Sequence, residues 1–251
     1  MKIKEIYTYL DSLSPFELQE SWDNSGLIVG NMSDSFENLY ISMDLDLELV
    51  QDLKPNSLVI THHPLIFSGL KKVNYDTYST KILKELIKKD IALISMHTNI
   101  DKTHLNRYFV EKVLLYSVES SEDFIVTCKV DMSFENLLKD LSSKLNTKNL
   151  KFTKTKDYIN TLAICTGSAM SLLDFVKTDC FLTGDIKYHD AMEASARDIC
   201  LVDIRHYESE RCFNLVLEEL LEEYLKKNKL KAIITASKNP FQFFIEGETI
   251  E

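Results

Sequence analysis

The chain has 251 residues, of which 45% are hydrophobic and 27% charged, and this composition excludes collagen-like, low-complexity and disordered classes. Its 29 basic and 39 acidic residues give a net charge of −10, which repels phosphate backbones, so nucleic-acid binding is not expected. Five cysteines without a C-x-x-C pair indicate reduced packing residues and a cytoplasmic location. No stretch has the length and apolar character of a membrane helix, and the acidic residues near the start argue against a signal peptide.

The first half of the chain predicts helices that alternate with strands. The run NSLVITHHP, residues 56–64, is apolar and β-branched and ends in proline, which predicts a buried strand with two histidines at its carboxyl end. A helix near 79–89 and a strand over 91–97 then complete a β-α-β unit. The other elements expected here are helices over 2–12, after the cap residue Ser14 and over 46–54, and strands over 26–30 and 38–44.

The second half continues the alternation and predicts an α/β fold. The second half resembles the first: the segments DCFLTGDIKYHD and ICLVDIRHYESE flank a helix, as SLVITHHP and IALISMHTNID do. This similarity indicates either an internal duplication or two strand pairs such as any α/β sheet contains. Open α/β sheets bind ligands outside the carboxyl ends of their strands, so we expect the polar residues there to line one cleft. The expected elements are strands near 124–130, 160–166, 180–183 and 199–204, and helices near 133–146, 169–177, 188–197 and 208–228.

Five of the six histidines stand at or just after predicted strand ends, namely His62, His63, His97, His189 and His206. A single histidine at a strand end has an ordinary explanation. The adjacent pair His62 and His63 is harder to dismiss, because neighbouring side chains of a strand point to opposite faces and Pro64 keeps the backbone extended. Two such imidazoles suit two neighbouring metal ions.

Two further segments supply carboxylates. HTNID places His97 and Asp101 at what we expect to be a strand-to-loop transition, and HYESE places His206 and Glu210 on one face of a starting helix. Together, imidazole and carboxylate ligands suit zinc, iron, manganese or nickel, and five ligands exceed the needs of one catalytic metal. The ligand set His62, His63, Asp101, His206 and Glu210 therefore predicts two divalent metals per chain and metal-assisted hydrolysis.

At these residues the sequence resembles the GTP cyclohydrolase 1 type 2 homologues, also described as dinuclear metal-centre hexameric proteins. The resemblance covers essentially the whole chain, through ESWDNSGLIVG (20–30), ITHHPLIF (60–67), HTNID (97–101), TGDIKYHDAMEA (183–194) and HYESE (206–210). It implies that the same five residues bind the metal pair. It also implies a homohexameric ring of chains, each with two intertwined α/β repeats over about 1–120 and 121–251, with mixed sheets, outer helices and no inserted middle domain.

The resemblance implies an activity as well: opening of the guanine imidazole ring of GTP with loss of formate. We expect His97, as a proton-transfer or supporting group, and Glu210 to carry catalytic roles, although His97 also fits a plain strand-end histidine. The alternatives are a dinuclear phosphoesterase and a non-catalytic metal-binding or regulatory ring protein. No GxxxxGK[ST] or GxGxxG motif supports a P-loop NTPase or a Rossmann dehydrogenase.

Other residues are weaker candidates for the site. Arg205 stands where we expect a small residue, so that its guanidinium would enter the pocket and change its charge. The segment Trp22, Asp23 and Asn24 contacts substrate or forms a turn, His189 lines the site or is an ordinary surface residue, and Lys71 and Lys72 neutralise a triphosphate or remain on the surface.

Overall fold

The computed structural model describes residues 1–245 and 248–250, which form two compact units. The first unit consists of Met1–Asp11, Trp22–His97 and Leu221–Glu251, and the second of Ser12–Ser21 and Thr98–Leu220. The predicted repeats over 1–120 and 121–251 stay a prediction.

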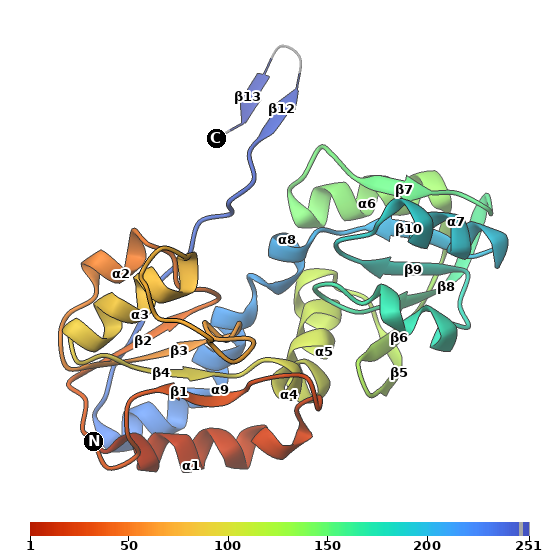
Figure 1. Cartoon of the computed structure of the whole chain (residues 1–251). Coiled ribbons are helices and arrows are strands. Elements are labelled where there is room, and N and C mark those ends of the chain that lie inside the picture. The colour runs from red at the N-terminus through yellow and green to blue at the C-terminus, as the bar shows by residue number, and fades with distance from the viewer. Residues whose placement is uncertain (246–247, 251) are drawn as a thin grey trace. The chain divides into compact units, whose positions relative to one another are not determined.

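The first unit is built on a five-stranded mixed sheet (Figure 1). Its strand order is β1 (Gly26–Val29), β4 (Ala92–Ser95), β3 (Ser57–Thr61), β2 (Asn38–Ser42) and β11 (Ala232–Ile234). All pairs are parallel except β1 with β4. Every residue of β3 and β4 is buried, as expected for central parallel strands, which are covered on both faces.

Helices pack on this sheet against side chains that come from every second residue of its strands. Tyr40, Val59 and Leu93 of three adjacent strands pack in one core cluster with α2 (Leu49–Asp52) and α3 (Tyr78–Lys88). α3 starts at a capping box formed by Thr77 and Thr80. Of the four apolar positions that predicted the helix, Ile82, Leu83 and Leu86 are buried, whereas Ile87 is exposed. The unit also contains most of α1 (Ile3–Leu13) and the antiparallel pair β12 (Phe243–Ile245) and β13 (Glu248–Ile250).

The second unit has a six-stranded mixed sheet (Figure 1). β8, β9 and β10 run parallel at its centre, and the other three strands pair antiparallel. The strand order is β5 (Val118–Glu122), β6 (Ile125–Ser133), β8 (Tyr158–Ile164), β9 (Cys180–Thr183), β10 (Cys200–Asp203) and β7 (Lys151–Thr153). The two mixed sheets and their helices confirm the predicted α/β class.

Helices of the second unit pack on both sides of this sheet. Ala163, Phe181 and Leu201 share a core cluster with α7 (Tyr188–Ala196) and the 3-10 helix Met170–Phe175, whereas α6 (Phe134–Leu145) contacts β6 and β8. All five cysteines are free and buried, which confirms their interpretation as packing residues. Within residues 1–245 and 248–250, none of the helices combines the length and apolar character that a bilayer crossing requires.

Three predicted elements need correction. The segment after His97 is helical rather than a loop, with α4 (Thr98–Ile100) and α5 (Asn106–Tyr108) joined to π-helical turns over Asp101–Leu105 and Phe109–Val113. Ile100, Leu105, Phe109 and Val110 of this segment are buried in the core, whereas Asp101, at the start of the first π-helical turn, is partly exposed.

The last predicted helix, 208–228, is in fact two helices. α8 (His206–Glu210) ends before α9 (Phe213–Asn228) begins. α9 buries Phe213, Val216, Leu217 and Leu221 on one face, and the side chains of its four glutamates, Glu218, Glu219, Glu222 and Glu223, are exposed. The third correction concerns the helix predicted near 169–177, which is the short 3-10 helix rather than an α-helix.

Candidate metal centre

Three histidines converge at one edge of the sheet in the first unit. His62 and His63 directly follow β3, and His97 lies two residues beyond the end of β4. Because β3 and β4 are parallel and pair Thr61 with Ser95, their carboxyl ends meet at the same edge. The ring centroids lie 4.7–5.4 Å apart, and one nitrogen of each ring lies within 4.8 Å of the others. Such a group can hold a metal cation.

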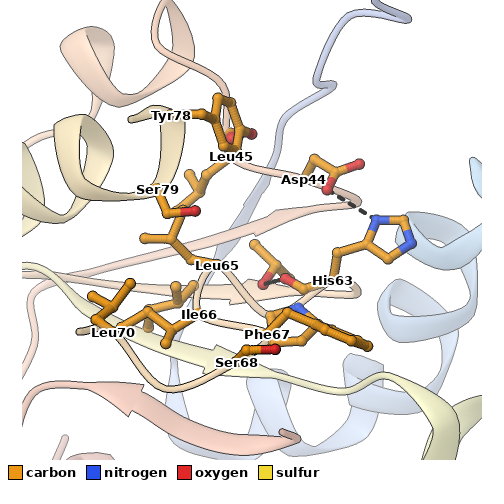
Figure 2. A pocket seen from close by; sticks show the side chains of 13 residues that line it. Asp44, Leu45, His63, Leu65, Ile66, Phe67, Ser68, Leu70, Tyr78 and Ser79 are labelled. Atoms are coloured by element: carbon orange, nitrogen blue, oxygen red, sulfur yellow. Dashed lines mark hydrogen bonds and ion pairs between the residues drawn. The ribbon is translucent and has the colours of Figure 1, made fainter. Parts of the chain in front are cut away.

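Oxygen acceptors orient all three imidazoles through Nδ1. The acceptors are the Met96 carbonyl for His62 (2.9 Å), Asp44 for His63 (2.9 Å; Figure 2) and Asp23 for His97 (2.7 Å). A carbonyl oxygen only accepts, so Nδ1 of His62 carries the proton and Nε2 carries the lone pair. The carboxylates favour the same tautomer in the other two rings. Metal-binding histidines typically show this arrangement, in which the second ring nitrogen donates to a carboxylate or carbonyl.

The residues that hydrogen-bond to His97 belong to the WDNS segment. The Asp23 side chain is fully buried and also accepts a hydrogen bond from Ser25 Oγ at 3.1 Å. The same hydroxyl accepts from the backbone N–H of His97 at 3.2 Å. The segment therefore fixes both the ring and the backbone of His97, so Asp23 acts on the site through His97.

The second unit holds a histidine and a carboxylate on one short helix. His206 and Glu210 are the first and last residues of α8, and His206 Nε2 lies 2.9 Å from Glu210 Oε2, which confirms that the two share a helix face. Asp185 lies 2.7 Å from Nδ1 of His206 and orients the ring. Asp185 follows β9 and His206 follows the parallel neighbour β10, so strand ends again supply the polar groups.

Two glycines allow the backbone to approach this pair closely. Gly167 has a φ of +64°, and a Cβ atom there would lie 2.1 Å from Glu210 Oε1. A Cβ atom at Gly184 would lie 2.7 Å from the backbone nitrogen of His206. Sequence reasoning missed both, although each follows a threonine at or near the end of a buried strand in a chain with only six glycines. Both positions require glycine because any side chain would collide with the site.

Asp101 is the first residue of a π-helical turn in the second unit. Burial raises the pKa of the Cys165 thiol well above its usual value, and the nearby carboxylates of Asp101 and Glu210 raise it further. π-helical turns occur often at functional sites because they re-aim a side chain within a helix.

The structure places the weaker candidates as follows. The guanidinium of Arg205 donates to the Asn149 carbonyl at 2.7 Å and to Glu208 at 3.3 Å, partners outside the predicted ligand set. Arg205 has a φ of +62° and ψ of 150°, a conformation that only glycine adopts without strain, directly before His206. Lys71, Lys72 and His189 are exposed. Asp44 and Asp185, which orient two histidines, were not among the predicted site residues.

The first unit thus brings together His62, His63 and His97, and the second unit brings together His206 and Glu210. Asp101 also belongs to the second unit, at the start of its π-helical turn. The donor atoms are imidazole nitrogens and carboxylate oxygens. This chemistry fits a borderline first-row metal and does not favour calcium, which takes oxygen ligands.

The chain is similar to known proteins along nearly its whole length. A model of the Duf34/NIF3 (NGG1p interacting factor 3) family matches residues 1–240. A Campylobacter jejuni protein named GTP cyclohydrolase 1 type 2 homolog is 47% identical over 97% of this chain and 100% of its own length. A Helicobacter pylori protein named GTP cyclohydrolase 1 type 2 is 42% identical over 96% of this chain and 98% of its own.

The fold is also similar to that of a solved structure. The crystal structure of a hypothetical protein from Staphylococcus aureus has a TM-score of 0.85 and 29% identity, and the match covers 97% of this chain and 99% of that one. An α/β protein with histidines and carboxylates at the carboxyl ends of its central strands is the class that the fold and the site define. The chain belongs to the Duf34/NIF3 family.

Proposed function

We propose that this protein is a dinuclear metal-dependent hydrolase that opens the imidazole ring of GTP and releases formate. The proposed ligands are His62, His63, Asp101, His206 and Glu210, which together hold two divalent ions of zinc, iron, manganese or nickel. The observation that carries the proposal is the orientation of the histidines, since an oxygen acceptor lies at Nδ1 of each ring, the arrangement typical of imidazoles that bind a metal through Nε2. The names of the relatives support the choice of GTP.

Different residues of the chain have different roles in the proposed reaction. A bound pair of divalent metals lowers the pKa of water and stabilises negative charge that develops on the attacked atom. His97, whose Nδ1 is held by Asp23, would accept a proton at Nε2 from each of two waters. The proton of the first water goes to the ring nitrogen that leaves as the ring opens to a formamide, and the proton of the second goes to the amine nitrogen that leaves when the formamide is hydrolysed to formate. The buried carboxylate of Asp23 stabilises the imidazolium that exists between the uptake and the release of each proton. Glu210 supplies one of the two negative charges that offset the metals.

The test is turnover of GTP with detection of formate by purified protein reloaded with each candidate metal. We expect metal-dependent formate release that is lost in His63→Ala. The matched control is His189→Ala, because His189 is exposed and contacts only the ring of Tyr188 among the described contacts. Metal binding without release of formate or phosphate would contradict the proposal and favour a non-catalytic metal-binding protein. Phosphate release without formate would favour a phosphoesterase.

We also propose that the protein is a homohexamer. The family resemblance supports this assembly, as does Leu215 of α9, which is 49% exposed in the single chain and offers apolar surface to a neighbour. Sedimentation at micromolar concentration tests the proposal. A single species with the mass of one chain would contradict it.

A further inference from the structure

Two exposed aromatic side chains lie beside His97 in the first unit. Trp22 is 56% exposed and Phe67 49% exposed, and their ring centroids lie 5.7 Å apart with 41° between the planes. Each ring lies 6.2 Å from the imidazole of His97, which stands at 76° to both. We call Trp22 and Phe67 the aromatic platform. Contiguous exposed apolar surface beside polar groups is typical of a binding site.

A hydrogen bond links the two loops that carry the platform. Asn24 Nδ2 donates to the carbonyl oxygen of Ile66 at 2.5 Å, so the residue two positions after Trp22 is tied to the residue just before Phe67. Asp23, between Trp22 and Asn24, binds His97. The two loops and the imidazole therefore form one fixed arrangement. A ligand that binds there meets loops that are already linked, which limits the loss of backbone conformational entropy.

A cavity adjoins the platform. It has a volume of about 340 Å³, and Phe67 and His63 both line it (Figure 2). Leu65 and Leu70 give it apolar walls, and Ser79 adds a hydroxyl group. Its volume is at the small end of the range for ligand pockets. The space therefore suits a single ring system better than a whole nucleotide triphosphate.

We infer that Trp22 and Phe67 bind a planar heteroaromatic ring by stacking and present its edge to His97. Aromatic faces stack on nucleobases irrespective of base identity, and His97, at 6.2 Å from both rings, would border a base that lies on either of them. The platform explains why the polar WDNS segment carries an exposed tryptophan. The inference rests on the proposed function only for the identity of the ring, which is then the guanine base of GTP.

The chain offers a direct probe, because Trp22 is its only tryptophan. Titration of the metal-loaded protein with guanosine or GTP is expected to quench tryptophan fluorescence in a saturable way, whereas inorganic tripolyphosphate, which has no ring, is not. Phe67→Ala should weaken guanosine binding about 5- to 100-fold, the usual effect of losing one stacked aromatic side chain. Phe67→Tyr, which keeps the ring, should restore binding, and Phe241→Ala, at an equally apolar position that is 72% exposed, should leave it unchanged.

The results separate this inference from the proposed function. Turnover of GTP with an unchanged KM in Phe67→Ala would overturn the platform and leave the hydrolase proposal standing. Saturable quenching by guanosine without any turnover would support the platform and overturn the hydrolase proposal. Equal quenching by tripolyphosphate and guanosine would overturn stacking. A change in sedimentation of Phe67→Ala without a change in guanosine affinity would also overturn it, because the platform would then be a contact between chains.

Discussion

The Oδ1 atom of Asp23 lies 2.7 Å from Nδ1 of His97, and the Asp23 side chain is fully buried, whereas His97 keeps 14% of its side chain exposed. A buried carboxylate behind a partly exposed imidazole fixes the tautomer and stabilises the protonated ring. Within the proposed function this pair handles protons, and neither residue belongs to the proposed ligand set. Activity and metal content should therefore respond separately to substitutions here.

Replacement of Asp23 by Asn tests this separation. Asn keeps the shape of the side chain but removes the charge that stabilises an imidazolium at His97, so we expect GTP turnover to fall about 10- to 100-fold. Metal content, measured by elemental analysis, should stay at the wild-type value. Asp34→Asn, at an exposed position, is the matched control. Unchanged turnover in Asp23→Asn would show that His97 needs no charged partner.

His97→Gln addresses the role of the ring itself. We expect this variant to bind two metals and to lose turnover at all pH values, because Gln neither accepts nor carries a proton near neutral pH. The measurements are metal content and formate release on the same preparation. A loss of metal would instead identify His97 as a third ligand in the group of nitrogens that lie within 4.8 Å of one another.

Much of this site was predictable from sequence, and the reason is the position of the residues on strands. The histidines follow short apolar runs, and the carboxyl ends of parallel strands meet at one edge, so the predicted β-α-β unit already brings His62, His63 and His97 together. The i,i+4 spacing of His206 and Glu210 likewise predicted their contact. In both cases a local pattern decides the outcome.

The parts that sequence reasoning missed depend on tertiary contacts. Asp44 lies 19 residues before His63 and Asp185 lies 21 before His206, so no local spacing indicates these bonds. The three-residue edge strands β7 and β11 are too short for a clear alternation of apolar and polar residues. The π-helical turn at Asp101 was missed because it differs from an α-helix in its backbone hydrogen bonds, which the pattern of apolar residues does not reveal.

The buried cysteines give a prediction that is independent of function. Burial raises the pKa of Cys128 to about 12, with Glu119 and Glu111 adding to the shift, and burial holds the pKa of Cys180 well above its usual value. Because the thiolate is the reactive form, a thiol reagent at pH 8 should label the native protein very slowly and all five cysteines after denaturation. Fast stoichiometric labelling of the native protein would contradict the buried positions.

Glu210→Gln should remove metal without unfolding the protein. The variant keeps the shape of a side chain that is 4% exposed, but it removes one of only two negative charges in the proposed ligand set. We expect wild-type protein to bind two ions per chain after dialysis and reloading, and Glu210→Gln to bind one or none with no formate release. Circular dichroism should remain unchanged. Two metals and full turnover in the variant would exclude Glu210 as a ligand.

Gly167→Ala should displace the carboxylate of Glu210, because it adds a side chain to the backbone beside that carboxylate. The added Cβ would lie 2.1 Å from Glu210 Oε1, so the carboxylate has to move away from its position beside His206, and metal binding should weaken together with turnover. The φ of +64° adds a backbone cost of about 1–2 kcal/mol, which should appear as a lower free energy of unfolding in urea. Gly69→Ala is the matched control, because no atom lies within 4 Å of its Cβ and its φ is not positive, and we expect a change below about 0.5 kcal/mol. If Gly167→Ala loses stability but keeps both metals, the carboxylate of Glu210 does not bind a metal from the position that it occupies here.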